Sequence, residues 1–166
     1  LLKQSKISFE NNYKKNQKIN LTCLGAGNYA FKTLLPIFKK NKCNLDTIVS
    51  NSGLSGSYLG NKLGFRKTST DESEAMKGEE TNLIVIASPH NCHASQVVEA
   101  LKNNKNVFVE KPLALDMNEL IKIQQTYNQL VLENKNHSKL MIGFNRRFSP
   151  LSKKVKRLLE DSKSMK

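Results

Sequence analysis

The chain has 166 residues, of which 38% are hydrophobic and 25% are charged, and its formal net charge is +13. This composition is typical of a globular protein with a substantial core and excludes the disordered and fibrous classes. No apolar run approaches the ~20 residues needed to cross a bilayer, so we expect no membrane partner.

The positive charge by itself suggests a nucleic-acid partner. Of the 27 basic residues, however, 23 are lysines scattered over the whole length. Arginine, which recognises bases and phosphates better, occurs only at Arg66, Arg146, Arg147 and Arg157. We therefore predict no nucleic-acid partner, and a basic nucleic-acid binder is kept as a minor alternative.

The cysteines and the N-terminus indicate the compartment. Cys23, Cys43 and Cys92 have neither metal-ligand spacing nor an even number for disulfides, so no metal site is predicted. Cys23 lies in an apolar run and is expected in the core. The chain begins without Met, so we expect a piece of a longer protein. Its N-terminus has no signal peptide, and the cysteine pattern fits a reducing cytoplasm, which is the expected location.

Residues 1–18 are polar and basic and are predicted to be a tail or linker. Beyond them, apolar runs of strand type alternate with helical patterns. Extended segments are predicted at 19–24, 46–49, 65–67, 83–87, 107–109 and 140–144. Helices are predicted at about 28–41, 55–63, 71–78, 91–103, 116–134 and 150–161.

Individual residues qualify the predicted helices. Pro36 should kink or end the first one. Thr70 or Asp71 should cap the third, and Asn91 the fourth. Ser149 and Pro150 suit the cap and first residue of the last helix.

The alternation predicts an α/β fold: a doubly wound, Rossmann-type parallel sheet of about six strands over residues 19–150. Residues 151–166 would form a helix leading onward. Ligands of such folds bind at the carboxyl ends of the strands. We therefore look for the site at 25–30, 50–53, 88–93, 110–112 and 143–147.

The segment "LGAGNYA" places Gly25, Gly27 and Ala30 in a G-x-G-x-x-A pattern between a strand and a helix. Gly25 permits a tight turn, Gly27 admits a pyrophosphate close to the backbone, and Ala30 allows close helix–strand contact. The helix N-terminus, with Asn28 and Tyr29, offers its amides to the phosphate. The pattern predicts a dinucleotide cofactor.

The second strand ends in Ser50, Asn51 and Ser52, where an acid usually selects the unphosphorylated ribose. No carboxylate there would repel a 2′-phosphate, and the hydroxyls and amide could bond to one. The choice between NAD and NADP stays open, as does the alternative of an ordinary loop.

The segment "ASPHNCHASQ" follows the most apolar strand. Pro89 fixes the chain direction after Ser88, and His90 and His93 are histidines at a strand end. They are candidates for cofactor contact, and a structural role in the first helical turn is the alternative. With no third ligand beside them, a metal site is not predicted.

The segment "EKP" ends the strand 107–109. Because a residue before proline is pushed into extended geometry, Lys111 should leave the strand in a defined direction, and the Lys111–Pro112 bond could be cis. Lys111 could exchange a proton with a substrate oxygen, and Glu110 could pair with it or hold a ribose hydroxyl. Two surface charges at a strand end are the alternative.

Together, "GAGNYA", "SPHNCHA", "VFVEKPLAL" and "LMIGFNRRFSP" give residues 19–150 a close resemblance to the Gfo/Idh/MocA family of NAD(P)-dependent oxidoreductases. The sequences of these segments are most similar to those of a subgroup in which this module is fused behind a zinc-type alcohol dehydrogenase. The resemblance implies that Lys111 is the catalytic lysine, that Glu110 and Pro112 shape the nicotinamide end, and that residues 88–93 border the cofactor. It places Asn145 and Arg146 near the nicotinamide or the substrate entrance.

The resemblance also implies a second α/β domain, which has no counterpart in this chain. The hypothesis is thus the NAD(P)-binding domain of an oxidoreductase acting on a sugar, nucleotide sugar or cyclitol, inactive without its second domain. The alternative is a non-catalytic dinucleotide-binding regulatory module. Apolar surface that meets the second domain in the family could support homo-oligomers.

Overall fold

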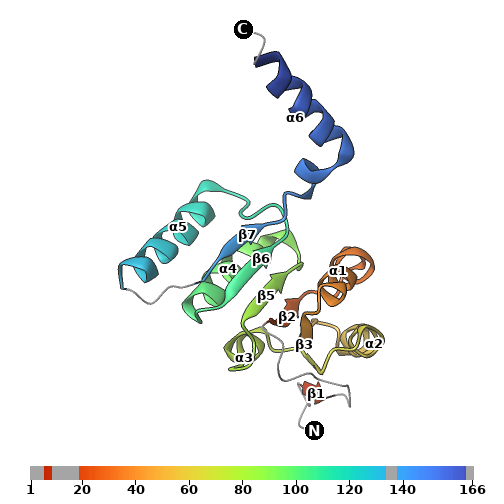
Figure 1. The fold of residues 1–166 in the computed structure, drawn as a ribbon. Coiled ribbons are helices and arrows are strands. Elements are labelled where there is room, and N and C mark those ends of the chain that lie inside the picture. The colour runs from red at the N-terminus through yellow and green to blue at the C-terminus, as the bar shows by residue number, and fades with distance from the viewer. Residues whose placement is uncertain (1–5, 9–18, 134–137, 164–166) are drawn as a thin grey trace.

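The structure is a computed structural model that describes residues 6–8, 19–133 and 138–163, and its centre is a sheet flanked by helices (Figure 1). The strands are β1 (Lys6–Ser8), β2 (Asn20–Leu24), β3 (Asn44–Val49), β4 (Lys67–Ser69), β5 (Leu83–Ile86), β6 (Asn106–Val109) and β7 (Leu140–Ile142). The α-helices are α1 (Leu35–Lys40), α2 (Gly53–Leu63), α3 (Glu72–Lys77), α4 (His93–Lys102), α5 (Met117–Leu132) and α6 (Pro150–Lys163).

The strand order is β1-β4-β3-β2-β5-β6-β7, and strands β2 to β7 pair in parallel. The predicted doubly wound parallel sheet is confirmed. β2 pairs with β3 on one side and β5 on the other, so that Leu24 faces Val49 and Ile86. From β2 the strand order therefore runs outward in both directions, to β3 on one side and to β5 on the other. Such a reversal of strand order places a ligand crevice at the carboxyl end of β2.

The first strand differs from the prediction of a polar tail over residues 1–18. Residues 6–8 form β1, which pairs antiparallel with β4, with Lys6 opposite Ser69. Its short, polar composition suits an edge strand, which needs no apolar face to pair. The remainder of the predicted tail lies outside the described residues.

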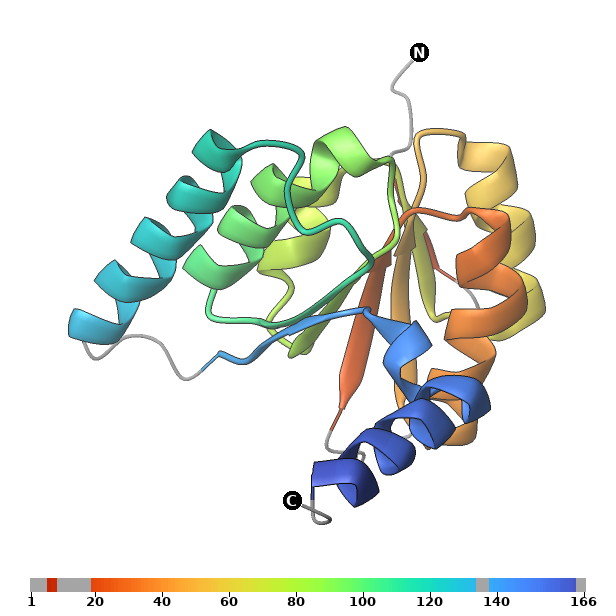
Figure 2. The same cartoon turned by 90° about the horizontal axis from the view of Figure 1, so that it is seen from above.

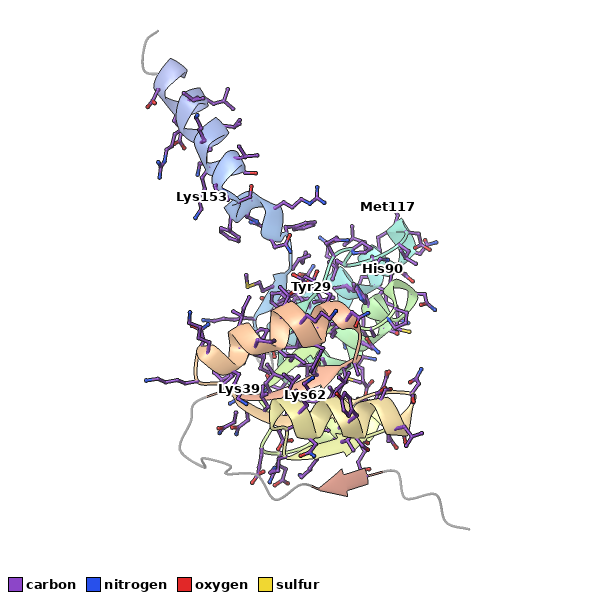
Figure 3. The ribbon with its side chains drawn as sticks, turned by 90° about the vertical axis from the view of Figure 1, so that its right-hand side faces the viewer. Tyr29, Lys39, Lys62, His90, Met117 and Lys153 are labelled. Atoms are coloured by element: carbon purple, nitrogen blue, oxygen red, sulfur yellow. The ribbon has the colours of Figure 1, made fainter. Side chains whose placement is uncertain are left out.

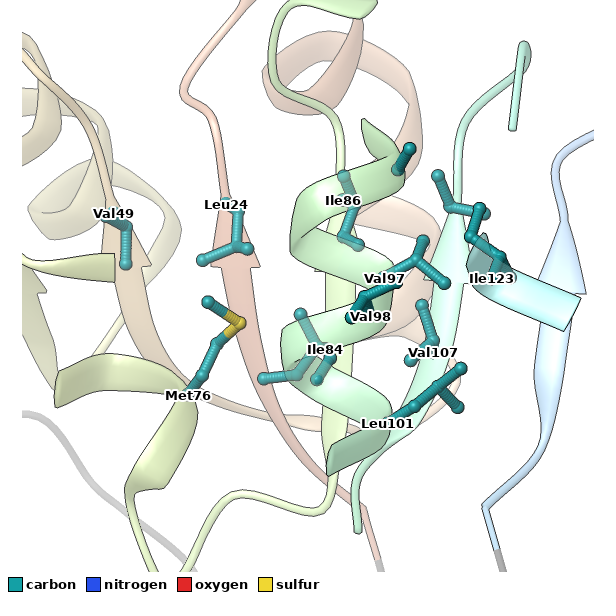
Figure 4. Packing of buried hydrophobic residues seen from close by; sticks show 13 residues of the cluster. Leu24, Val49, Met76, Ile84, Ile86, Val97, Val98, Leu101, Val107 and Ile123 are labelled. Atoms are coloured by element: carbon teal, nitrogen blue, oxygen red, sulfur yellow. The ribbon is translucent and has the colours of Figure 1, made fainter. Parts of the chain in front are cut away.

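Helices cover both faces of the sheet (Figure 2). On one face, Met76 of α3, Val97 of α4 and Ile123 of α5 pack on Ile84 and other residues of the central strands (Figure 4). On the other face, α1 and α2 pack on a second cluster that contains Leu35, Leu63 and Phe65. β5 lies between the two layers, and its residues Ile84, Val85 and Ile86 are fully buried, as its continuous apolar sequence predicts.

The first helical segment continues through Pro36 to Lys40 and does not end early, but its winding changes just before the proline. The chain is helical from Asn28, but Ala30–Leu34 is wound as a π-helix before α1 begins. Proline provides no backbone N–H, so regular hydrogen bonding cannot pass through it. Farther along α1, Lys39 donates a hydrogen bond of 2.7 Å to the Leu63 carbonyl oxygen, which joins α1 to the end of α2; Figure 3 labels Lys39 beside Lys62.

Two predicted helix starts are confirmed and one is wrong. Asp71 caps α3 by accepting a hydrogen bond from the Glu74 amide, and Ser149 accepts one from the Ser152 amide at the start of α6. Asn91 is not a cap, because it lies inside a 3₁₀ turn over His90–Cys92 that precedes α4.

Two extended segments are shifted relative to prediction. β4 begins at Lys67, whereas 65–67 was expected; the Arg66 side chain binds Asp46, and the pairing with β3 starts one residue later. β7 ends at Ile142 because tight turns follow it, in which the Phe144 amide bonds to the Ile142 carbonyl oxygen. These differences move element ends and leave the predicted order unchanged.

Cys23 lies in β2 with no exposed surface, as predicted for a core residue. Burial raises the pKa of its thiol to about 12. All three cysteines are free.

Helix α6 extends away from the sheet (Figures 1 and 2). Its apolar side chains at Leu151, Val155, Leu158 and Leu159 are all more than half exposed. The assignment of 151–166 as a connection to a second domain stays a prediction. Within the described part of the chain, no helix combines the length and apolarity needed to span a bilayer.

Candidate active site at the carboxyl ends of the strands

The turn after β2 depends on two glycines for different reasons. Gly25 has a φ of +99°, and a Cβ at this position would lie 2.6 Å from the Ala87 carbonyl oxygen, so a side chain is excluded there. A Cβ on Gly27 would meet nothing within 4 Å, because this residue borders open space. Ala30 is buried against the sheet, as the third position of the pattern requires.

Two neighbouring cavities open at this turn. The first, of about 320 Å³, is lined by Lys111, Glu110, Asn145 and Arg146 and is called here the lysine cavity. The second, of about 470 Å³, is lined by Ser50, Asn51, Ser52 and Pro89 and is called the serine cavity. Gly27, Ala87 and Ser88 line both, so the two cavities adjoin each other along the edge of the sheet.

The strand ends singled out in the sequence thus meet at one edge. The predicted residues that line one cavity or the other are Gly25, Gly27, Tyr29, Ala30, Ser50, Asn51, Ser88, Pro89, His90, His93, Glu110, Lys111, Asn145 and Arg146. Asn28 is exposed and lines neither cavity. Figure 3 shows Tyr29 and His90 at the end of the sheet from which α6 extends.

Lys111 leaves the end of β6 with an exposed side chain, and the Lys111–Pro112 bond is cis. The lysine and Gly27 line the same cavity although they are far apart in sequence. Parallel strands with neighbouring carboxyl ends produce this arrangement, since β2 and β6 are each paired to β5. An ammonium therefore lies on the same side of the sheet as the glycine turn.

Glu110 differs from its neighbour in being buried. Only 9% of its surface is exposed, and its Oε1 atom has no hydrogen-bond partner among the described residues. The carboxylate lies against Gly143, where a Cβ would be 2.8 Å from Oε1. A buried carboxylate oxygen without a donor is costly. Glu110 as a residue also lines the lysine cavity, so its carboxylate is a candidate acceptor at the edge of that cavity, while Oε1 itself is buried against Gly143.

His93 connects two strand-end segments. Its ring is fully buried, with Nδ1 2.7 Å from the Pro112 carbonyl oxygen and Nε2 3.0 Å from the Ser88 carbonyl oxygen. A neutral imidazole donates one of these hydrogen bonds, and a doubly protonated ring donates both. Both nitrogens are directed at backbone, so the geometry favours the structural alternative for His93, whereas the His90 ring is exposed beside it.

Two polar residues of the site were not predicted from the sequence. The Gln96 amide nitrogen donates a 2.8 Å hydrogen bond to Glu72 Oε2, and the Gln96 amide oxygen accepts one from the Ser88 hydroxyl. Glu72 follows β4 at the start of α3 and lines the serine cavity. The carboxyl end of β4 lies at the same edge as that of β3, because the two strands are paired in parallel.

The residues fit a bound dinucleotide. The absent side chain of Gly27 leaves room for a pyrophosphate beside the backbone, and the two adjoining cavities offer space on either side of it. Glu110 provides a carboxylate at the lysine end, and Ser50 and Ser52 provide hydroxyls at the other. An adenosine at the serine cavity and a nicotinamide at the lysine cavity would use both sets.

Comparison with known proteins identifies the family of this chain. The family described as "Oxidoreductase family, NAD-binding Rossmann fold" (GFO_IDH_MocA) matches residues 19–144, and the chain belongs to this family. The resemblance inferred from the sequence is confirmed at this level. The cofactor class is thus NAD(P).

A curated relative is the myo-inositol 2-dehydrogenase of Thermotoga maritima, 33% identical over 101 residues, which are 60% of this chain and 28% of that protein. The apo scyllo-inositol dehydrogenase from Lactobacillus casei has a similar fold, with a TM-score of 0.75, 24% identity and coverage of 87% of this chain and 42% of that one.

A third similar structure is the WlbA dehydrogenase from Chromobacterium violaceum in complex with NADH and UDP-GlcNAcA. It has a TM-score of 0.76 and 16% identity, with 90% of this chain and 41% of that chain covered. The chain therefore spans less than half the length of the proteins named here.

Proposed function

We propose that this chain is the NAD(P)-binding part of an oxidoreductase that transfers a hydride to or from a carbon bearing a hydroxyl or carbonyl group. The substrate class proposed is a sugar, nucleotide sugar or cyclitol. The single observation that supports it most is that Lys111 and the Gly27 turn line one cavity. The inositol dehydrogenases among the relatives support the substrate class.

The roles proposed for the site residues follow from their positions. The glycine turn and the first helix would hold the pyrophosphate, Glu110 would accept a ribose hydroxyl, and Lys111 would give or take the proton of the substrate oxygen. A bound nicotinamide would accept or supply the hydride. Ser88 and Asn145 line the same cavity and would position the ring.

The substrate contacts are proposed to come from a second domain outside this chain. Positioning of a substrate contributes a large part of a rate enhancement, so the chain by itself should bind the nucleotide weakly and turn over no sugar. The fusion behind a zinc-type alcohol dehydrogenase, inferred from the similarity of the motif sequences, stays a prediction. Self-association through the exposed apolar residues of α6 is a further expectation for the isolated chain.

The location proposed is the cytoplasm, supported by three free cysteines of which two are buried. No nucleic-acid binding is proposed, in line with the lysine-rich composition. A filter-binding assay with duplex DNA at low salt tests this statement, and tight, steeply salt-dependent binding would contradict it.

The experiment that tests the proposed function is calorimetric titration of the chain with NADH and NADPH. Saturable binding of at least one nucleotide, lost in Gly27→Asp, is expected because an added carboxylate at this open position would repel the pyrophosphate. Absence of binding would refute the proposal. In the whole protein, Lys111→Met should retain nucleotide binding and lose turnover; binding without turnover of any sugar or cyclitol by the unmodified protein would instead favour the regulatory module.

A further inference from the structure

We infer that this chain selects NAD(H) over NADP(H) and that Glu72 sets the preference. The inference rests on the proposed function, because it concerns the serine cavity as the place of the adenosine ribose. The loop after β3, with Ser50, Asn51 and Ser52, has no acid and leaves the choice open. The structure supplies a carboxylate from another element.

Glu72 reaches the cavity from α3, at the end of the neighbouring strand β4. It lines the serine cavity together with Ser50, Asn51 and Ser52. The fold requires this proximity, since β3 and β4 are paired in parallel and end at the same edge, with Val49 opposite Ser69. The acid that usually follows the second strand is thus provided one strand further along the sheet.

The Glu72 side chain is held in place by hydrogen bonds. Gln96 Nε2 donates a hydrogen bond of 2.8 Å to Glu72 Oε2, and Gln96 Oε1 in turn accepts a hydrogen bond from the Ser88 hydroxyl. Gln96 is only 3% exposed, so this connection is fixed by packing. The carboxylate therefore has a restricted orientation at the cavity wall, and one of its oxygens is not used by Gln96.

A 2′-phosphate would meet no compensating charge here. Neither lysine nor arginine occurs among the described residues that line the serine cavity. Two lysines of the neighbouring elements have other contacts: Lys62 of α2 lies over the Phe31 and Tyr58 rings, and Lys67 at the start of β4 lines a separate small cavity with Asp46 and Glu74. Proteins bind phosphate groups through charge-assisted hydrogen bonds from cations, and a dianion beside an uncompensated carboxylate is repelled.

The uncharged ribose of NAD(H) suits the same surroundings. Its hydroxyls can donate to the Glu72 carboxylate and exchange hydrogen bonds with Ser50 or Asn51. The cavity thus offers both an attraction for the free hydroxyl and a repulsion for its phosphorylated form. Specificity arises from the difference between these two affinities.

The test is calorimetric titration of the chain with NADH and NADPH in the same low-salt buffer. NADH is expected to bind about tenfold more tightly or better. In Glu72→Gln, which keeps an oxygen for Gln96, NADPH should gain severalfold in affinity, while NADH should lose affinity because a hydrogen bond to a charged carboxylate is replaced by one to a neutral amide. The matched control is Glu74→Gln on the same helix, because Glu74 binds Lys6 and lines a different cavity. In this control the difference between the NADH and NADPH affinities should be unchanged.

The outcomes separate the two proposals. Equal or tighter binding of NADPH, with NADH also bound, would overturn the preference and leave the proposed function intact. If the difference between the NADH and NADPH affinities is the same in Glu72→Gln as in the unmodified chain, the role of Glu72 is overturned. Binding of neither nucleotide would refute the proposed function and this inference together. As a gain-of-function arm, Asn51→Arg should raise NADPH affinity severalfold, since it adds a cation to the cavity wall.

Discussion

The His93 imidazole joins α4 to the segment that follows β6, with Nδ1 2.7 Å from the Pro112 carbonyl oxygen. The other ring nitrogen faces the Ser88 carbonyl oxygen at 3.0 Å, so one buried side chain connects the exits of β5 and β6. Lys111 precedes Pro112 directly. The position of the proposed catalytic lysine therefore depends on a residue whose two ring nitrogens face backbone carbonyl oxygens.

The first prediction concerns this connection. His93→Ala should lower the free energy of unfolding by about 3 kcal/mol, because it opens a cavity in place of a fully buried ring and removes the imidazole hydrogen bond to a backbone carbonyl. His90→Ala is the matched control, since its ring is exposed, and should change stability by less than about 0.5 kcal/mol. Urea denaturation of the two variants gives the comparison, and equal losses would contradict the assigned role.

The two glycines of the turn give a second prediction. Gly25→Ala should destabilise the fold by more than about 2 kcal/mol, because φ is +99° and the new methyl group would lie 2.6 Å from the Ala87 carbonyl oxygen. Gly27→Ala adds the same group in open space and should leave the unfolding free energy within about 0.5 kcal/mol.

Gly27→Ala, which should hardly change stability, should nevertheless weaken nucleotide binding. The methyl group of Gly27→Ala would occupy space proposed for the pyrophosphate, so NADH affinity should fall about tenfold although the fold is intact. Thermal melts and calorimetry on the same samples measure both quantities. A Gly27→Ala variant that binds NADH like the unmodified chain would place the pyrophosphate elsewhere.

Much of this site could be predicted because its residues directly follow strands. The G-x-G-x-x-A turn at Gly25 and the end of β6 at Lys111 are recognisable from apolar runs that stop abruptly, and parallel pairing brings them to one edge. The core positions of β5 were predictable for the same reason, since a continuous β-branched run is typical of a strand covered on both faces.

The remaining features depend on side-chain directions or on weak local signals. Glu72 follows a three-residue strand without a motif, and its link to Gln96 connects residues of two different helices. The burial of His93 could not be predicted, because a histidine in a first helical turn suits a ligand contact and a structural role equally. β1 is polar and pairs through its backbone, which leaves no periodicity in the sequence.

A third prediction concerns Gly143 and Glu110. In Gly143→Ala the new Cβ would lie 2.8 Å from Glu110 Oε1 and 3.2 Å from Phe108 Cζ, so the carboxylate must move. Stability should fall by about 1 kcal/mol and NADH affinity severalfold, because Glu110 is the proposed ribose acceptor.

A double-mutant cycle assigns this effect. In a Glu110→Ala background the stability loss caused by Gly143→Ala should shrink, since the closest side-chain neighbour of the added methyl group is gone. Gly78→Ala serves as the control outside the site, where the nearest atom is 3.4 Å away. Additive losses in the cycle would show that the carboxylate is not the group displaced.

The last prediction is an alkaline destabilisation caused by Cys23. Burial raises the pKa of this thiol from 9.0 to about 12 in the folded chain, so the unfolded chain loses its proton first as pH rises. The stabilising contribution of the protonated thiol is complete below pH 9 and is lost between about pH 9 and 12, amounting to about 2 kcal/mol by pH 10.5. Urea denaturation at pH 8 and pH 10.5, compared with Cys23→Ala, isolates the effect from that of other titrating groups. The variant should lose about 2 kcal/mol less between the two pH values; parallel losses would mean that the thiol titrates alike in the folded and unfolded chains.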